Sequence, residues 1–164
     1  MRLRVAAILT FLILAFCPTL WARGKPDAKF TASFHMEAEG NDHPKMVFSQ
    51  LANGKQRLFR RMPEIGTKDI VSFSPFPSEV GDGYGVVFRL SPTATRRLSA
   101  VSAVNLNRWM IAQVNGRVVD GVLIDKQIDD GLLVVWKGLT LEDTRLFDET
   151  IPRIGEEGKK KKKK

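Results

Sequence analysis

The chain has 164 residues and a formal net charge of +8, and its only cysteine is Cys17. This length fits one domain with short flanking segments, and a single cysteine excludes an internal disulfide. The charge lies at the two ends, because residues 22–158 hold 18 basic and 18 acidic side chains. The basic composition therefore does not describe the surface of the folded domain, and we expect no specific nucleic-acid ligand.

Residues 1–22 have the layout of a secretory signal peptide, with a basic start, an apolar run and a short exit region ending at Ala22. The apolar run, residues 5–16, is shorter than the roughly 20 residues that span a bilayer. We therefore expect cleavage after Ala22, a flexible lead-in over residues 23–29, and export to the periplasm or the extracellular space. Lipidation of Cys17 and an uncleaved anchor are the alternatives.

Three strands are predicted at the start of the exported part. Apolar and polar residues alternate over Phe30–Glu39, which is typical of a half-buried strand with His35 on its polar side. Lys45–Leu51 and Gln56–Met62 predict two more strands, and Asn53-Gly54 between them suits a tight hairpin turn. This pattern predicts a three-stranded meander.

The next segment predicts two strands and a helix. Asp69–Phe73 is a short strand, Ser74–Gly83 a loop with two prolines and two glycines, and Tyr84–Leu90 a longer strand. Ser91 is a good helix cap, so that a helix is expected over Pro92–Val104. The residues that share its apolar face are Ala94, Leu98 and Val101.

A second hairpin follows this helix. The apolar run Met110–Val114 leads into Asn115-Gly116, whose residue types favour the positive φ angles of a tight turn, and Arg117–Ile124 returns as a strand. A polar break, Asp129–Gly131, then precedes the apolar strand Leu132–Trp136. These are scaffold segments without side chains suited to catalysis.

The last predicted element is a helix in which Thr140 and Asp143 form a capping-box pattern and which ends before Pro152. Its expected buried residues are Leu141, Leu146 and Phe147. The predicted fold class is α+β: a mostly antiparallel sheet of six or seven strands with two helices on one face, in a single domain over residues 30–154. Residues 155–164 are expected to form a disordered, lysine-rich tail.

The order of these segments resembles a known family. Tyr84–Pro92 leads into "A-x-V-N-G-R-V-V", "I-x-D-G" and "G-L-T-L-E-D". The head subdomain of the periplasmic region of SecD, the accessory subunit of the bacterial protein-export channel, has a similar progression, "V-x-D-G-K-V-V…I-x-x-G…I-x-G-x-F-T…E-E-A". The resemblance covers about residues 84–148, and Asn107-Arg108-Trp109 replaces a glycine-containing link. It implies the fold of that subdomain and does not imply transport.

The polar side chains do not form a recognisable catalytic or metal site. His35 and His43 are the two histidines, and a metal would need carboxylates or cysteines that converge on them. Glu37 shares the strand face of His35, but one such pair is ordinary on a surface. Asp129-Asp130 lies in a turn and Glu142-Asp143 in a first helical turn, where negative charge is favourable. We expect no enzyme activity, no metal and no cofactor.

Aromatic and basic residues give two further expectations. Arg57, Phe59 and Arg61 share one face of a predicted strand, as on some nucleic-acid-binding surfaces, although in a neutral domain such a strand is usually solvated. Trp109 and Trp136 are expected to anchor the core or its edge, because large aromatic side chains supply much buried area.

The sequence favours an exported, non-catalytic binding or interaction domain with a protein partner in the cell envelope. A second hypothesis is a cell-envelope protein that docks on anionic lipid or polymer through its tail. A small hydrolase is a third class, which the lack of a recognisable catalytic triad disfavours. The tail residues that would contact an anionic surface are Lys159, Lys160, Lys161, Lys162, Lys163 and Lys164.

We predict that the exported protein begins near Arg23 and contains no cysteine, because the signal-peptide pattern ends at Ala22. Intact-mass measurement of protein from the extracytoplasmic fraction checks this. A mass that retains residues 1–22, or a lipid on Cys17, would contradict it.

Overall fold

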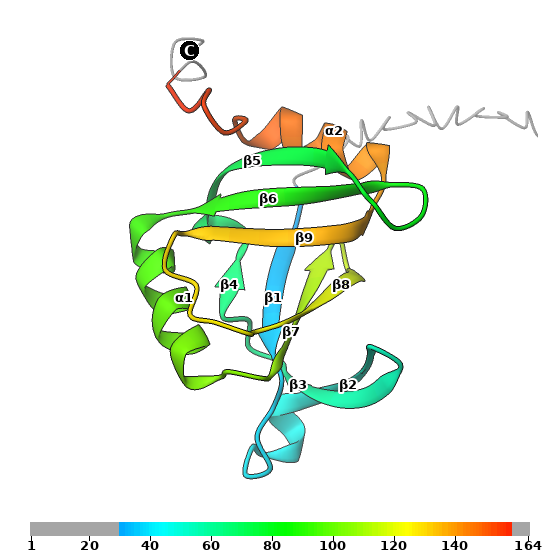
Figure 1. Ribbon diagram of the computed structural model, residues 1–164, viewed down its shortest axis with the longest axis vertical. Helices are drawn as coiled ribbons and strands as arrows, with labels where there is room; N and C mark the ends of the chain where they lie inside the picture. Colours follow the sequence, from blue (N-terminus) through cyan, green and yellow to red (C-terminus); the bar gives the residue numbers. More distant parts are fainter. Residues whose placement is uncertain (1–29, 159–164) are drawn as a thin grey trace, which may run out of the picture.

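The computed structural model describes residues 30–158, so that the predictions for residues 1–29 and 159–164 lie outside the described part. Two α-helices and nine strands are found in the described residues (Figure 1). None of these helices is long and apolar enough to cross a membrane. The helices are α1 (Pro92–Val104) and α2 (Leu141–Thr150). The strands are β1 (Ala32–Met36), β2 (Val47–Ala52), β3 (Lys55–Arg60), β4 (Ile65–Gly66), β5 (Ile70–Pro77), β6 (Tyr84–Leu90), β7 (Trp109–Val114), β8 (Arg117–Leu123) and β9 (Leu132–Leu139).

The strands form three antiparallel sheets, with the orders β4-β1-β7-β8, β2-β3 and β5-β6-β9. The α+β class and the antiparallel pairing confirm the prediction. The number of strands and their grouping differ from the prediction: the described residues form nine strands in three sheets, not one sheet of six or seven strands. Figure 1 shows α2 beside β5 at the top of the molecule and α1 at the left, beyond the end of β6.

The predicted three-stranded meander is wrong. Strand β1 pairs with β4 and β7 instead of β2, and only an isolated bridge, Glu37 to Phe59, joins the end of β1 to β3. The reason is visible in the burial of β1, where Phe34, His35 and Met36 are all buried. The β2–β3 hairpin covers the His35 side of β1, where the Phe48 ring lies 5.4 Å from the imidazole centroid and the carbonyl of Arg60 accepts a hydrogen bond from it. Both faces of β1 are thus covered, unlike those of the half-exposed strand that the alternation suggests.

Local turn chemistry was predicted well. Asn115 and Gly116 have φ angles of 50° and 76°, and Val114 pairs with Arg117 across this two-residue turn. Strand β6 and helix α1 have the predicted bounds, and the hydroxyl of Ser91 accepts a hydrogen bond from the N–H of Ala94 at 3.3 Å. These features depend on neighbouring residues alone, which is why the sequence reveals them.

Strand β5 extends further than predicted, to Pro77, and includes part of the predicted loop of residues 74–83. Prolines are acceptable there because β5 is an edge strand. Pro75 has no backbone N–H, but on the open side of the strand no neighbouring strand requires one. In α2, Phe147 is fully buried as expected, but Leu141 is 49% exposed. Leu141 is the first residue of that helix and lies beyond the core.

Asp143 joins the second hairpin to α2. Its carboxylate accepts hydrogen bonds from the N–H and hydroxyl of Thr140, from the amide of Asn115 at 2.7 Å and from Arg117 at 2.6 Å. Burial raises the pKa of Asp143, but these hydrogen bonds and the Arg117 charge outweigh it, so that the pKa lies below its ordinary value. The capping box predicted from Thr140 and Asp143 is therefore confirmed, and it also fixes the tip of the hairpin.

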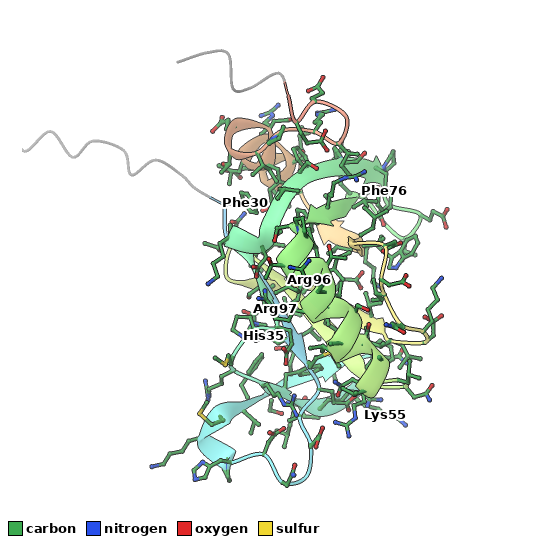
Figure 2. The ribbon with its side chains drawn as sticks, turned by 90° about the vertical axis from the view of Figure 1, so that its left-hand side faces the viewer. Phe30, His35, Lys55, Phe76, Arg96 and Arg97 are labelled. Carbon is green, nitrogen blue, oxygen red and sulfur yellow. The ribbon has the colours of Figure 1, made fainter. Side chains whose placement is uncertain are left out.

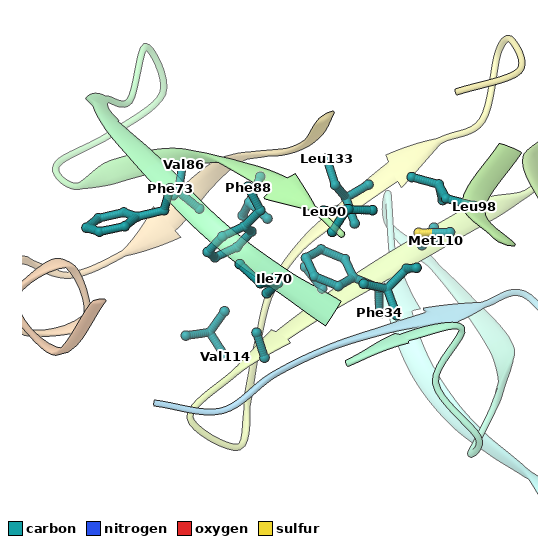
Figure 3. Close-up of a cluster of buried hydrophobic side chains, with 14 of the residues drawn as sticks. Phe34, Ile70, Phe73, Val86, Phe88, Leu90, Leu98, Met110, Val114 and Leu133 are labelled. Carbon is teal, nitrogen blue, oxygen red and sulfur yellow. The ribbon is translucent and has the colours of Figure 1, made fainter. Parts of the chain in front are cut away.

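One main hydrophobic core lies between the two larger sheets (Figure 3). Both helices contribute to it, α1 with Ala94 and Leu98 and α2 with Phe147. Phe34 from β1 and Phe88 from β6 meet edge to face, with ring centroids 6.1 Å apart. A smaller cluster of Ala52, Phe59 and Ile111 attaches the β2–β3 hairpin to the body.

We predict that Gly116→Val lowers the free energy of unfolding by about 1–3 kcal/mol, because a β-branched residue resists positive φ. No atom lies within 4 Å of a Cβ built on Gly116, so the loss would come from backbone strain and not from a clash. Gly40→Val is the matched control, because Gly40 is equally open and lacks a positive φ. Chemical denaturation of both variants is the measurement, and equal stabilities would contradict the prediction.

Candidate functional site

An apolar cleft separates the edge strands of the two larger sheets. Strand β8 is the outer strand of the four-stranded sheet, and β9 is the outer strand of the three-stranded sheet. The cleft between them has a volume of about 260 Å³. It is lined by Phe34, Met110, Ala112, Val122, Leu123, Ile124, Asp125, Lys126, Ile128, Asp130, Leu132, Leu133, Val134 and Trp136.

The two edge strands meet at one end of the cleft. The carboxylate of Asp120 in β8 accepts a hydrogen bond from the backbone N–H of Trp136 in β9 at 2.8 Å, and another from the N–H of Gly121 at 2.9 Å. Asp120 is buried. Close by, Gly138 has a φ of 86°, and a Cβ on it would collide with the carbonyl oxygen of Val119. A glycine is therefore required where β9 passes β8.

The floor of the cleft belongs to the main core. Phe34, Met110 and Ala112 come from β1 and β7, and each is nearly inaccessible to solvent. The rim is different, because Trp136 is 59% exposed and Leu123 is 41% exposed. An apolar group that entered the cleft would lose water from both the floor and these two rim side chains, which favours binding.

The segment between β8 and β9 forms one wall, and it is fixed to α1. The N–H of Ile128 donates to the hydroxyl of Ser102 at 2.9 Å, and the amide of Gln127 donates to the hydroxyl of Ser99 at 2.7 Å. Ile124 exchanges backbone hydrogen bonds with residues 107 and 108. The wall is therefore held in place without a ligand, so that the cleft is largely preformed.

An aromatic pair continues the rim onto the outer face of the three-stranded sheet. The rings of Phe76 and Trp136 lie 6.1 Å apart and nearly perpendicular. Phe76 is the register partner of Gly85, and a Cβ on Gly85 would collide with the Phe76 ring. The glycine thus leaves space for the ring. Trp136 was predicted to anchor the core or its edge. It lies on the edge strand β9, where its side chain packs against Phe76 on the outer face and stays exposed.

The chemistry of the cleft suits binding. Its titratable lining side chains, Asp125, Lys126 and Asp130, are all exposed at the rim. The Asp130 carboxylate accepts the N–H of Leu132 at 2.9 Å and so completes the turn that precedes β9. The lining residues include no histidine, cysteine or serine that could act as a nucleophile or as a base paired with one.

The alternation predicted that His35 lies on the polar, exposed side of its strand, and this prediction is wrong. It is buried, its Nδ1 donates to the carbonyl of Arg60 at 2.9 Å, and its Nε2 accepts from the hydroxyl of Ser33 at 2.9 Å. Burial lowers the pKa of His35, against the opposing effect of the Arg60 hydrogen bond. His43 lies elsewhere and caps a short 3-10 helix, where its ring nitrogen accepts the N–H of Lys45.

The basic-aromatic strand is not a free nucleic-acid surface. Arg57 forms an ion pair with Glu37 at 2.7 Å and lies over the ring of Trp109 at 5.4 Å from its centroid. Phe59 is fully buried. Glu37 therefore does not form a surface pair with His35, and its second oxygen accepts the backbone N–H of Trp109 at 2.9 Å. The lysines of residues 159–164 lie outside the described part of the chain.

No protein-family profile and no curated protein matches the sequence. Among solved structures, one of SecDF, described as a membrane component that enhances protein export, matches with a TM-score of 0.51 and 14% identity over 73% of this chain and 60% of that one. A crystal structure of SecDF in a super-membrane-facing form matches with a TM-score of 0.45 and 10% identity, over 80% of this chain and 31% of that one. The likeness is one of fold.

The fold likeness to SecDF confirms the resemblance seen in the sequence and extends it. The sequence pattern covers residues 84–148, whereas the structural match spans 73% of the chain and so must include residues outside that segment. The chain spans 60% of the length of the SecDF structure that it matches.

We predict that Asp120→Ala lowers the free energy of unfolding by about 1–3 kcal/mol, because it leaves the N–H of Trp136 without its buried acceptor. Asp125→Ala is the control, because Asp125 is an exposed aspartate of the cleft lining, and surface substitutions usually change stability by less than about 0.5 kcal/mol. Thermal unfolding followed by circular dichroism measures both. Equal effects would show that Asp120 does not hold the two strands together.

Proposed function

We propose that this protein is an exported, non-catalytic binding module whose cleft between β8 and β9 takes an extended, apolar polypeptide segment. The observation that carries the proposal is the separation of two sheet edges above an apolar floor. Edge strands offer backbone N–H and C=O groups that can pair with an added strand, and apolar pockets between such edges select side chains.

The backbone of β9 supports this mode of binding. The N–H of Trp136 points away from β6, because it donates to Asp120 of β8. Backbone groups alternate in direction along a strand, so those of Val134, two residues earlier, face the same side. Val134 also lines the cleft. An extended segment beside Val134 would therefore find both hydrogen-bond partners and apolar contacts.

The fold similarity to a SecDF structure is compatible with this proposal. The matched SecDF structure is described as a membrane component that enhances protein export. A module that holds extended apolar segments beyond the membrane would suit the signal-peptide pattern of this chain. The chain spans 60% of that structure, so we do not extend the activity of the whole SecDF protein to it and propose binding alone.

We expect a fluorescent peptide of alternating valine and threonine to bind the protein, as measured by fluorescence anisotropy. Leu123→Asp should weaken binding at least about tenfold, because it places a charge at the rim of an apolar cleft. Leu141→Asp is the control, since Leu141 is similarly exposed and lies on α2, outside the cleft lining.

A second peptide separates backbone pairing from simple apolar contact. N-methylation of alternate amides keeps the side chains and removes the N–H donors, so that strand addition should be lost. If the methylated peptide binds as well as the parent peptide, the segment does not add to a strand edge. If neither peptide binds, or if both aspartate variants bind equally, the proposed function is wrong.

A further inference from the structure

The β2–β3 hairpin carries many basic and no acidic residues. Residues 43–63 include five basic side chains and no aspartate or glutamate, although residues 22–158 as a whole are neutral. The hairpin and the loop before it extend from the lower end of the molecule, away from the sheet of β5, β6 and β9 (Figure 1). Figure 2 shows Lys55, next to the turn of this hairpin, far from Phe76 of the upper sheet. The basic residues are Lys45, Lys55, Arg57, Arg60 and Arg61.

Two of the five charges are neutralised by the flanking segments. Arg57 pairs with Glu37, as described above, and Arg60 contacts Asp42 at 3.1 Å and Glu39 at 3.3 Å. The hydrogen bond and the charge of Asp42 raise the pKa of Arg60. These two arginines attach the hairpin to the body and are not available to a ligand.

The other three charges remain available. Lys45, Lys55 and Arg61 have exposed side chains, and within residues 30–158 they form no ion pair. Lys55 lies next to the turn, whereas the other two lie at the base, where the guanidinium of Arg61 donates to the carbonyl of Lys45 at 3.1 Å. The hairpin therefore presents positive charge along its whole length.

The same segment exposes apolar side chains, and the leucines among them lie on the face opposite to Lys55 and Arg61. Four of the eleven large apolar side chains that are exposed in residues 30–158 belong to this short segment: Met46, Leu51, Leu58 and Met62. The register pairs Ser49 with Leu58 and Leu51 with Gln56, so both leucines lie on the hairpin face opposite to that of Phe48 and Phe59. Phe59 faces the body and is fully buried, which leaves the leucines on the outer face.

We propose that this hairpin is a contact site for an anionic phospholipid surface. Exposed apolar side chains with flanking basic residues bind at membrane interfaces, where the apolar groups enter the headgroup boundary and the charges meet phosphates. A stable protein interface needs roughly 20–30 residues on each side, and the outer face of one hairpin offers far fewer. The acidic side chains beside the hairpin, Glu37, Glu39 and Asp42, are paired with Arg57 and Arg60, so that the charges of Lys45, Lys55 and Arg61 remain in excess.

The test places an environment-sensitive fluorophore at position 58 of the full chain, by Leu58→Cys in a background with Cys17→Ser. We expect a blue shift with vesicles of phosphatidylglycerol and phosphatidylcholine, and none with phosphatidylcholine alone. The same fluorophore at position 104, through Val104→Cys, is the control, because Val104 is exposed on α1 and should stay in water. No shift at position 58, even if the chain sediments with anionic vesicles, would overturn the proposal and point to the lysine tail.

Charge variants test the electrostatic part. Combined Lys45→Gln, Lys55→Gln and Arg61→Gln should weaken the vesicle response at position 58 at least about tenfold. Combined Arg96→Gln, Lys137→Gln and Arg145→Gln removes the same charge from exposed positions elsewhere and should leave the response nearly unchanged. A shift of equal size with phosphatidylcholine alone, or equal losses in the two triple variants, would overturn the assignment of an anionic surface to this hairpin.

Discussion

Edge-to-face contacts between phenylalanine rings hold the two larger sheets together. The ring centroid of Phe147 in α2 lies 4.9 Å from that of Phe30, 5.4 Å from that of Phe73 and 5.5 Å from that of Phe88. The ring of Phe88 also contacts Phe34 of β1 edge to face. Such pairs prefer a perpendicular arrangement, which fixes distance as well as direction. The sheets therefore approach closely around this cluster, whereas β8 and β9 join directly only near Asp120 and leave the cleft open beyond it.

Features that depend on adjacent residues could be read from the sequence. The helix caps at Ser91 and Thr140 and the turn at Asn115-Gly116 are present as predicted, because side chains that bond to the local backbone, or tolerate positive φ, act within a few residues. The partition into three sheets could not be predicted, because it depends on which distant strand β1 pairs with. Its alternating pattern describes one covered face, whereas the β2–β3 hairpin packs Phe48 against His35 and covers the other face as well.

The candidate cleft also could not be predicted from the sequence, for two physical reasons. Its lining comes from β1, β7, β8, β9 and the segment after β8, which no single pattern connects. Trp136 was expected at the core or its edge because of its size, and the sequence did not reveal that Gly85 leaves space for Phe76, so that the aromatic pair lies on the outer face. The arginines of β3 show the same limit, since a run of charges does not reveal that Glu37 and Asp42 neutralise part of it.

The place of β1 inside the four-stranded sheet also determines when the chain can fold. Its central partner is β7, and Ala32 pairs with Val114, so the sheet cannot close until most of the domain is available. Contacts between segments so far apart in sequence form slowly, because the intervening loop must first be ordered. Before β7 is synthesised, β1 can pair only with the two-residue strand β4, so its main neighbour becomes available late in synthesis.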